Sequence, residues 1–178
     1  DIDTKPRIAF LHPNIAEIGK SARLTAFGWN LKSPLKPEYP KKTGVFEQLE
    51  IDIPEKLTLS NDQTGLGRML TESPIHGFAY HLPGSNRAVR ISTTNTAIIQ
   101  DTEKNNSTLN ALPIQIPAEI SGRLAAADER DYYLIQARAG EVYYLEAFGQ
   151  RINSPVDLQL SIFATNSKEK PIEIFNDI

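Results

Sequence analysis

Residues 101–162 read DTEKNNSTLNALPIQIPAEISGRLAAADERDYYLIQARAGEVYYLEAFGQRINSPVDLQLSI. Near the end of this stretch Leu158, Leu160 and Ile162 alternate with polar residues. A period of two places apolar side chains on one face of a strand and polar side chains on the other. The segment therefore predicts a β-strand with one buried and one solvated face.

Two aromatic runs precede that strand. Tyr132 and Tyr133 form the first run, and residues 142–145, VYYL, form the second. The second run is apolar on both faces, which is typical of a central strand that is covered on both sides. The Ala-Gly-Glu triplet at 139–141 lies between the runs and predicts a tight hairpin turn.

The chain before residue 100 has the same strand-like period. The expected strands lie within residues 5–31, where they form a hairpin, and within residues 49–53, 57–59, 78–82 and 89–91. Residues 32–44, with three prolines and four lysines, predict a solvated loop, and residues 61–73 predict a second loop. No segment keeps the period of 3.6 that an amphipathic helix requires. The chain is therefore predicted to be all-β.

Composition narrows the function classes. The formal net charge is -3 and the lysines are scattered, which argues against a nucleic-acid partner because such binding needs a clustered basic face. The chain has no cysteine, so disulfides, thiolate nucleophiles and zinc–thiolate sites are excluded. No apolar run reaches the ~18 residues of a membrane-spanning helix. A change in composition near residue 100 predicts two domains, residues 1–100 and 101–178.

Residue types recur in a specific order through the second half. They are Glu103-Lys104-Asn105-Asn106, Ile116-Pro117, Ile120-Ser121-Gly122, Asp128-Glu129-Arg130-Asp131-Tyr132-Tyr133, Ala139-Gly140-Glu141, Tyr144-Leu145-Glu146-Ala147 and Ser154-Pro155-Val156-Asp157. This order resembles the bacterial pre-peptidase C-terminal (PPC) domain, a jelly-roll-like β-sandwich that is appended to secreted proteases and other exported bacterial proteins. The resemblance covers residues 101–178.

The first half carries a shorter resemblance. Within residues 5–31 the order is Pro, apolar strand, Pro-Asn, Gly-Lys-Ser, strand and Gly-Trp-Asn-Leu. It resembles the first two strands of immunoglobulin-like IPT/TIG domains, and the whole arrangement is similar to that of large exported planctomycete proteins. Together the resemblances imply two β-sandwich domains, an Ig-like one followed by a PPC-like one. PPC domains usually continue beyond the strand at residues 171–175, so the second sandwich is expected to be incomplete in this chain or completed by a neighbouring chain.

An oxygen-rich set of side chains marks a candidate metal site. Calcium takes six to eight oxygen ligands from carboxylates, amides and carbonyls. In the collagen-binding domains of clostridial collagenases, which are PPC domains, calcium lies between an E-x-N-N linker and a D-x-x-D turn. Carried over by position, the resemblance implies calcium ligands at Glu103, Asn105, Asn106, Asp128 and Asp131, with Asp101 as a weaker candidate. The alternative is that these are solvated side chains, with Asp131 and Asn106 capping turns.

Aromatic side chains offer a second kind of candidate site. Tyr132, Tyr133, Tyr143 and Tyr144 are interpreted as sheet and core packing, with a binding surface as the alternative. Trp29 is interpreted as a buried anchor between sheets, with a sugar platform as the alternative.

No nucleophile elbow or histidine triad is present in the sequence, so we expect no catalytic residue. The expected function is that of non-catalytic binding or spacer modules of an exported bacterial protein, stabilised by calcium and acting in adhesion or substrate targeting. The protein would be secreted, periplasmic or on the cell surface. Its partners would be an extracellular protein or polysaccharide and other domains of the same polypeptide. Two alternatives remain: an accessory region of a secreted protease or other hydrolase whose catalytic domain lies outside this chain, and a small enzyme in its own right.

Overall fold

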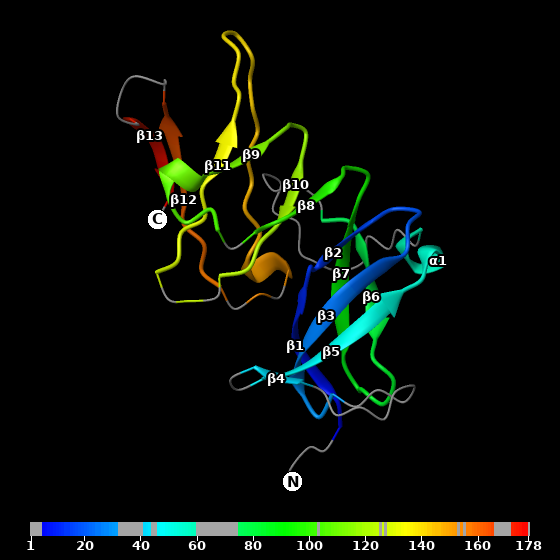
Figure 1. The fold of residues 1–178 in the computed structure, drawn as a ribbon. Helices are drawn as coiled ribbons and strands as arrows, with labels where there is room; N and C mark the ends of the chain where they lie inside the picture. The colour runs from blue at the N-terminus through cyan, green and yellow to red at the C-terminus, as the bar shows by residue number, and fades with distance from the viewer. Residues whose placement is uncertain are drawn as a thin grey trace. The chain divides into compact units, whose positions relative to one another are not determined.

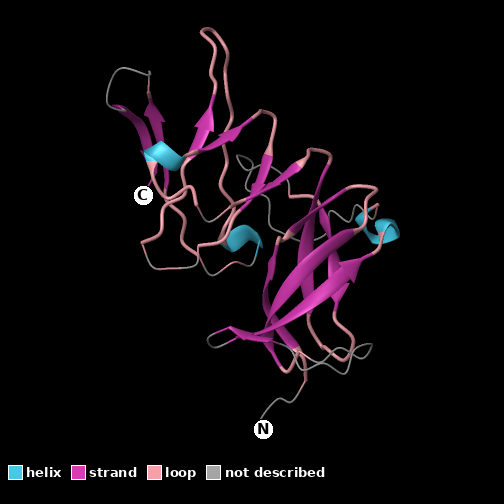
Figure 2. Ribbon diagram, viewed as in Figure 1, coloured by secondary structure: helices cyan, strands magenta, loops and turns pink. Residues whose placement is uncertain are grey.

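The structure is a computed structural model. It describes residues 5–31, 41–43, 46–59, 75–102, 104–124, 126, 128–152, 154, 156–165 and 172–177. Strands dominate the described residues (Figure 2), which confirms the all-β prediction. The chain divides into two compact units, Asp1–Ala139 and Gly140–Ile178.

The first unit contains a four-stranded antiparallel sheet of order β1-β3-β5-β4 (Figure 1). Its strands are β1 (Arg7–His12), β3 (Ala22–Trp29), β5 (Phe46–Ile53) and β4 (Lys41–Thr43). The hairpin predicted within residues 5–31 is confirmed by the pairing of β1 with β3. The predicted loop at 32–44 is wrong at its end, because the backbone of β4 pairs with β5 and forms an edge strand. Residues 32–40 lie outside the described part.

A second sheet in the first unit has the order β2-β7-β6. It consists of β2 (Ile15–Glu17), β7 (Ala88–Thr94) and β6 (Gly77–His81). Strand β2 pairs parallel with β7, whereas β6 and β7 pair antiparallel. The Ser85 amide donates to the Leu82 carbonyl oxygen at 2.9 Å and closes a turn between β6 and β7.

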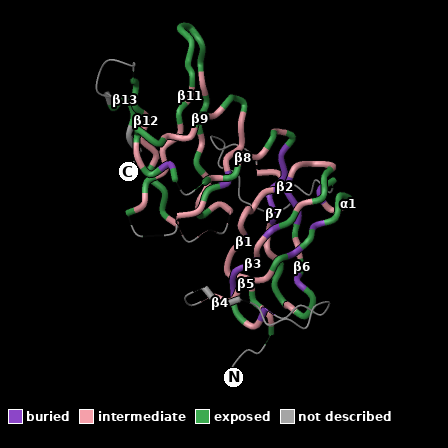
Figure 3. The backbone as a smooth tube through the Cα atoms, in the orientation of Figure 1, coloured by how far each residue is buried: buried purple, intermediate pink, exposed green. Residues whose placement is uncertain are grey.

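Both sheets contribute side chains to one hydrophobic core. The buried residues gather on these strands, as Figure 3 shows for this unit. Leu24 on β3 and Ile53 on β5 meet Phe78 on β6 and Ile91 on β7 in this core. Alternation along each strand supplies the apolar face, because every second residue points inward. The prediction that each half is a β-sandwich stays a prediction.

A short helix replaces one predicted strand. Residues 57–59 were expected to continue the strand period, but α1 (Glu55–Thr58) forms instead. Pro54 lacks an amide hydrogen and so ends the ladder of β5, while its carbonyl oxygen accepts from the Leu57 amide at 2.9 Å. Leu57 still packs against the core, whereas Leu59 is 58% exposed, so the helical turn buries only the first of the two leucines. The expected loop at 61–73 lies outside the described residues.

The remainder of the first unit is built from short parallel pairs. Strand β8 (Ile98–Gln100) pairs with β10 (Glu119–Ser121), and β9 (Leu112–Ile114) pairs with β11 (Tyr133–Ile135). A 3-10 turn, η1 (Thr108–Asn110), precedes β9. Strand β8 had been expected to close the first domain, and its partner comes from beyond residue 100. The domain boundary at residue 100 stays a prediction.

The second unit contains η2 (Gln150–Ile152) and the antiparallel pair β12 (Leu160–Ala164) and β13 (Ile172–Asp177). The predicted turn at 139–141 is confirmed, and Gly140 takes the left-handed conformation there with φ 86°. The central strand predicted at 142–145 is wrong. This run pairs with no strand among the described residues, and Val142 and Tyr144 are 96% and 76% exposed. In the described part of the chain, no helix has the length and apolar character needed to cross a membrane.

Candidate metal centre

Backbone hydrogen bonds bring three separate segments of the first unit together. The Asp101 amide donates to the Ser121 carbonyl oxygen at 3.0 Å, which extends the parallel pairing of β8 with β10. The Tyr132 amide donates to the Asn105 carbonyl oxygen at 2.7 Å, next to the parallel pairing of β9 with β11. The acidic segment that begins at Asp101 therefore runs beside both the end of β10 and the start of β11.

Asn105 is the most buried polar residue of this region, with 1% of its surface exposed. Its side-chain nitrogen donates to the Tyr132 carbonyl oxygen at 3.3 Å. Its side-chain oxygen is buried and has no hydrogen-bond partner among the described residues. Burying an amide oxygen without a hydrogen-bond partner destabilises the folded state by about 1–3 kcal/mol. This oxygen is therefore suited to coordinate a cation.

The Asp101 carboxylate lies nearby. Both of its oxygens are buried without a hydrogen bond of normal geometry to any described residue. Gly122 leaves room for this arrangement. A Cβ atom at position 122 would stand 3.3 Å from the Tyr133 hydroxyl oxygen and 3.6 Å from the Asp101 Cβ atom. A side chain at position 122 would thus enter the space between the phenol and the carboxylate.

The Tyr133 phenol interacts with three of the predicted calcium ligands, Asp101, Asn105 and Asp131. Burial raises the pKa of its phenol well above the usual range, and the nearby carboxylates of Asp101 and Asp131 raise it further. The Asn105 side chain also interacts with the phenol hydroxyl and lowers the pKa, but the increase dominates. The hydroxyl is therefore protonated at neutral pH and stands among the side chains of Asp101, Asn105 and Asp131.

The other predicted ligands are placed differently. Asn106 and Asp128 are both exposed, and Asp128 adopts the left-handed conformation with φ 61° in a turn. No hydrogen bond given for the described residues links either of them to the Tyr133 hydroxyl. Glu103 lies outside the described residues. The structure thus brings together Asp101, Asn105 and Asp131.

The chemistry of this cluster is that of hard oxygen ligands. Within the described ranges no group of three or more histidine, aspartate or glutamate side chains comes together. The cluster instead combines two carboxylates with an amide oxygen and a phenol. Such oxygens suit calcium more than zinc or copper, which prefer nitrogen and sulfur ligands. The Asp101 and Asn105 oxygens that lack partners fit a calcium ion, with further oxygens needed to reach six to eight.

The aromatic candidates divide between packing and exposure. Tyr133 belongs to the cluster, a role that the sequence analysis did not assign. The only sequence signal for that role is the Tyr-Tyr pair that follows the D-x-x-D block at 128–131, of which Tyr133 is the second member. In the second unit, a cavity of about 400 Å³ is lined by Tyr143, Tyr144, Leu145, Glu146, Ala147, Leu158, Leu160, Ile162 and Phe175. This hollow is open to solvent, since Tyr144 in its lining is 76% exposed.

Trp29 is not the buried anchor that was expected. Its side chain is 38% exposed, because the alternation of β3 places it on the face opposite to the core residues Leu24 and Ala26. The prediction of burial between sheets is therefore wrong.

Comparisons with protein-family models, curated proteins and solved structures found no match.

Proposed function

We propose that this chain is a pair of non-catalytic β modules from an exported bacterial protein, which acts in adhesion or substrate targeting. Calcium stabilises the module that contains residues 101–135. The resemblance of residues 101–178 to PPC domains supports the export and the accessory role. The absence of cysteine and of a nucleophile elbow in the sequence supports a non-catalytic role.

The observation that carries the calcium proposal is the set of buried oxygens on Asp101 and Asn105 that make no hydrogen bond of normal geometry to a described residue, although the Tyr133 hydroxyl interacts with both side chains. Two carboxylates, Asp101 and Asp131, act on the same phenol, and buried like charges repel each other unless a cation compensates them. Asp101, Asn105 and Asp131 would hold the ion. Glu103 is the nearest further carboxylate in the sequence.

Calcium would also link two segments of the first unit that are far apart in the sequence. Asp101 and Asn105 belong to the segment between β8 and β9, whereas Asp131 precedes β11. An ion shared by these residues would tie that segment to the start of β11. A ligand that binds only the folded state at a hundredfold excess over its Kd stabilises that state by about 2.7 kcal/mol.

The second candidate function is an accessory region of a secreted protease or other hydrolase whose catalytic domain lies elsewhere in the same polypeptide. The DERDYY block at residues 128–133 favours it, since the PPC domains that this block resembles are often appended to proteases. The coding sequence on either side of this chain distinguishes the two, because only the second requires an adjoining catalytic domain.

Differential scanning calorimetry of the full chain, with calcium or with a chelator, tests the calcium proposal. We expect about 10 mM calcium, a ten- to hundredfold excess over the Kd range of extracellular calcium modules, to raise the Tm of one transition by about 5 °C or more. Magnesium at the same concentration serves as the control, because this smaller ion requires a stricter octahedral geometry. Asp131→Asn should remove the increase, whereas Asp157→Asn, which changes an exposed carboxylate, should leave it intact. Equal Tm values in calcium and in chelator would contradict the proposal.

A further inference from the structure

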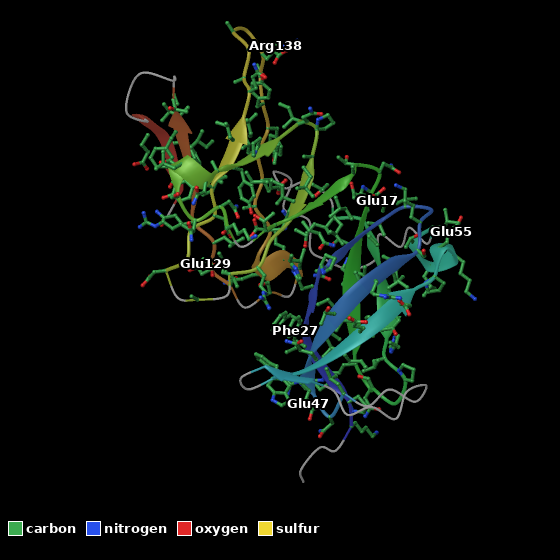
Figure 4. All side chains as sticks on the ribbon, in the orientation of Figure 1. Glu17, Phe27, Glu47, Glu55, Glu129 and Arg138 are labelled. Carbon is green, nitrogen blue, oxygen red and sulfur yellow. The ribbon has the colours of Figure 1, made fainter. Side chains whose placement is uncertain are left out.

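Four aromatic rings gather on the outer face of the first sheet. Strand β3 places Leu24 and Ala26 in the core. Because side chains alternate along a strand, Phe27 and Trp29 lie on the opposite face of the sheet. Phe10 comes from β1 and Phe46 from β5, the two neighbours of β3. We call Phe10, Phe27, Trp29 and Phe46 the aromatic platform. Figure 4 labels Phe27 on this sheet.

The rings support one another. Phe10 stacks on Phe27 with centroids 4.6 Å apart and meets Phe46 edge-on at 5.5 Å. Trp29 meets Phe46 edge-on at 5.0 Å. Phe27 is 5% exposed while Trp29 is 38% exposed, so the phenylalanines form the base and the indole is the open ring. The face of a sheet opposite to the core is normally polar, which makes this cluster of aromatic side chains unusual.

A cation accompanies the open ring. The Arg7 guanidinium lies over the Trp29 ring in a cation–π contact, 5.4 Å from the ring centroid, and Arg7 is itself exposed. It covers part of one face of the indole, so a ligand would pack on the part of the ring that Arg7 leaves open. No carboxylate of the described residues forms an ion pair with Arg7. An ion pair on the same sheet joins Arg23 and Asp52 at 2.8 Å. It lies at the end of the β3–β5 pairing that is farther from Trp29.

We propose that the aromatic platform binds an acidic sugar of a polysaccharide. The apolar face of the sugar ring packs on the exposed indole of Trp29, and the sugar carboxylate accepts hydrogen bonds from the Arg7 guanidinium. Arginine suits this role because its planar fork matches a carboxylate with two parallel hydrogen bonds.

The exposed area favours a sugar over a protein. A tryptophan side chain presents about 250 Å² in full, so 38% exposure leaves roughly 95 Å² open. That area is comparable to one sugar ring. A stable protein interface needs about 800 Å² on each partner. The base of the platform adds little to the open area, since Phe27 is nearly covered.

Fluorescence of the full chain tests this proposal directly, because Trp29 is the one tryptophan in the sequence. The probes are trigalacturonate and an alginate-derived trimannuronate, added in the presence of chelator. We expect a saturable shift of the Trp29 emission with at least one of them. The methyl ester of the same trimer, which keeps the ring and removes the charge, should bind about tenfold more weakly or worse.

Matched variants separate the site from general charge effects. Arg7→Gln should weaken binding by about tenfold or more, whereas Arg23→Gln, an exposed arginine of the same sheet, should change it less than about threefold. Trp29→Ala should abolish binding in calorimetric titrations while the circular dichroism spectrum stays unchanged. The proposal is overturned if neither trimer shifts the emission, or if tetraglutamate shifts it as strongly as the sugars do. The platform lies apart in sequence from the calcium ligands, and the use of chelator keeps this outcome independent of the calcium proposal.

Discussion

The Thr58 hydroxyl oxygen accepts a hydrogen bond from the Gly19 amide at 3.1 Å. The same hydroxyl lies 2.7 Å from the Glu55 carbonyl oxygen and 3.1 Å from the Lys20 carbonyl oxygen, to which it can donate. Thr58 is 1% exposed. One buried hydroxyl thus joins helix α1 to the turn between β2 and β3, where Gly19 takes a left-handed conformation with φ 72°.

Thr58→Val should lower the free energy of unfolding by about 1–3 kcal/mol, because valine keeps the shape and leaves the Gly19 amide without its acceptor. Urea denaturation measures this change as a lower midpoint at an unchanged slope. Thr58→Ser, which keeps the hydroxyl, should cost clearly less. Equal losses in the two variants would show that the methyl group, rather than the hydroxyl, stabilises this junction.

Leu24→Ala should destabilise the first unit by about 2–5 kcal/mol, since Leu24 is 1% exposed and the substitution leaves a cavity in the core. Leu109→Ala provides the control, because Leu109 is 95% exposed and its removal should change stability by less than about 0.5 kcal/mol. Chemical denaturation followed by circular dichroism checks both. A small effect of Leu24→Ala would mean that this core is not the stabilising centre of the unit.

Much of the first unit could be predicted from alternation alone. Strands β1, β3, β5, β6 and β7 follow the period of two because one face of each strand contacts a shared core. Alternation could not predict that Leu57 belongs to a helical turn, because two leucines are too short a pattern to distinguish a strand from a single turn of helix. It also failed at residues 142–145. Apolar residues form a covered strand only when sheet neighbours are available, and long-range pairing is not visible in a local pattern.

The candidate site was predictable in composition more than in arrangement. The oxygen-rich residues on both sides of β10 were evident from the sequence, and Asp101, Asn105 and Asp131 do surround one phenol. The weaker candidate, Asp101, has the buried carboxylate, whereas Asp128 is exposed. The parallel pairing of β8 with β10 causes this difference, because it brings Asp101 beside Gly122, and no residue type encodes that register locally.

Gly28→Ala should destabilise the first sheet by about 3 kcal/mol or more, through overpacking. A Cβ atom at this position would stand 2.0 Å from the Arg7 carbonyl oxygen, and backbone atoms of β1 cannot move aside without breaking the ladder. Gly140→Ala is the comparison, because no atom lies within 4 Å of its Cβ position and only the left-handed φ of 86° opposes the change. That variant should cost about 1–2 kcal/mol. Thermal unfolding of both variants gives the order, and a harmless Gly28→Ala would contradict the close approach of β1 to β3.

Stability should decrease in strongly alkaline solution because of Tyr133. Its pKa in the folded state is raised above the ordinary value of 10.0, chiefly by burial. The stabilising contribution of the neutral phenol is therefore complete below about pH 10 and is lost as the pH rises towards the folded-state pKa. Tyr133→Phe should flatten the alkaline part of the stability profile. Ultraviolet titration of phenolate provides a second measurement, in which the part of the absorbance change that occurs well above pH 10 should be lost in Tyr133→Phe.

Asp101 should contribute more to calcium affinity than Asp128 does. The Asp101 carboxylate oxygens are buried beside Asn105 and Tyr133, whereas the Asp128 side chain is exposed. We expect Asp101→Asn to weaken calcium binding by about tenfold or more and Asp128→Asn by less than about threefold, because a charged ligand lost from a buried site is not replaced by solvent. Isothermal titration calorimetry of the full chain compares the two variants. A larger loss in Asp128→Asn would mean that the ion is held at the exposed turn and not at the Tyr133 cluster.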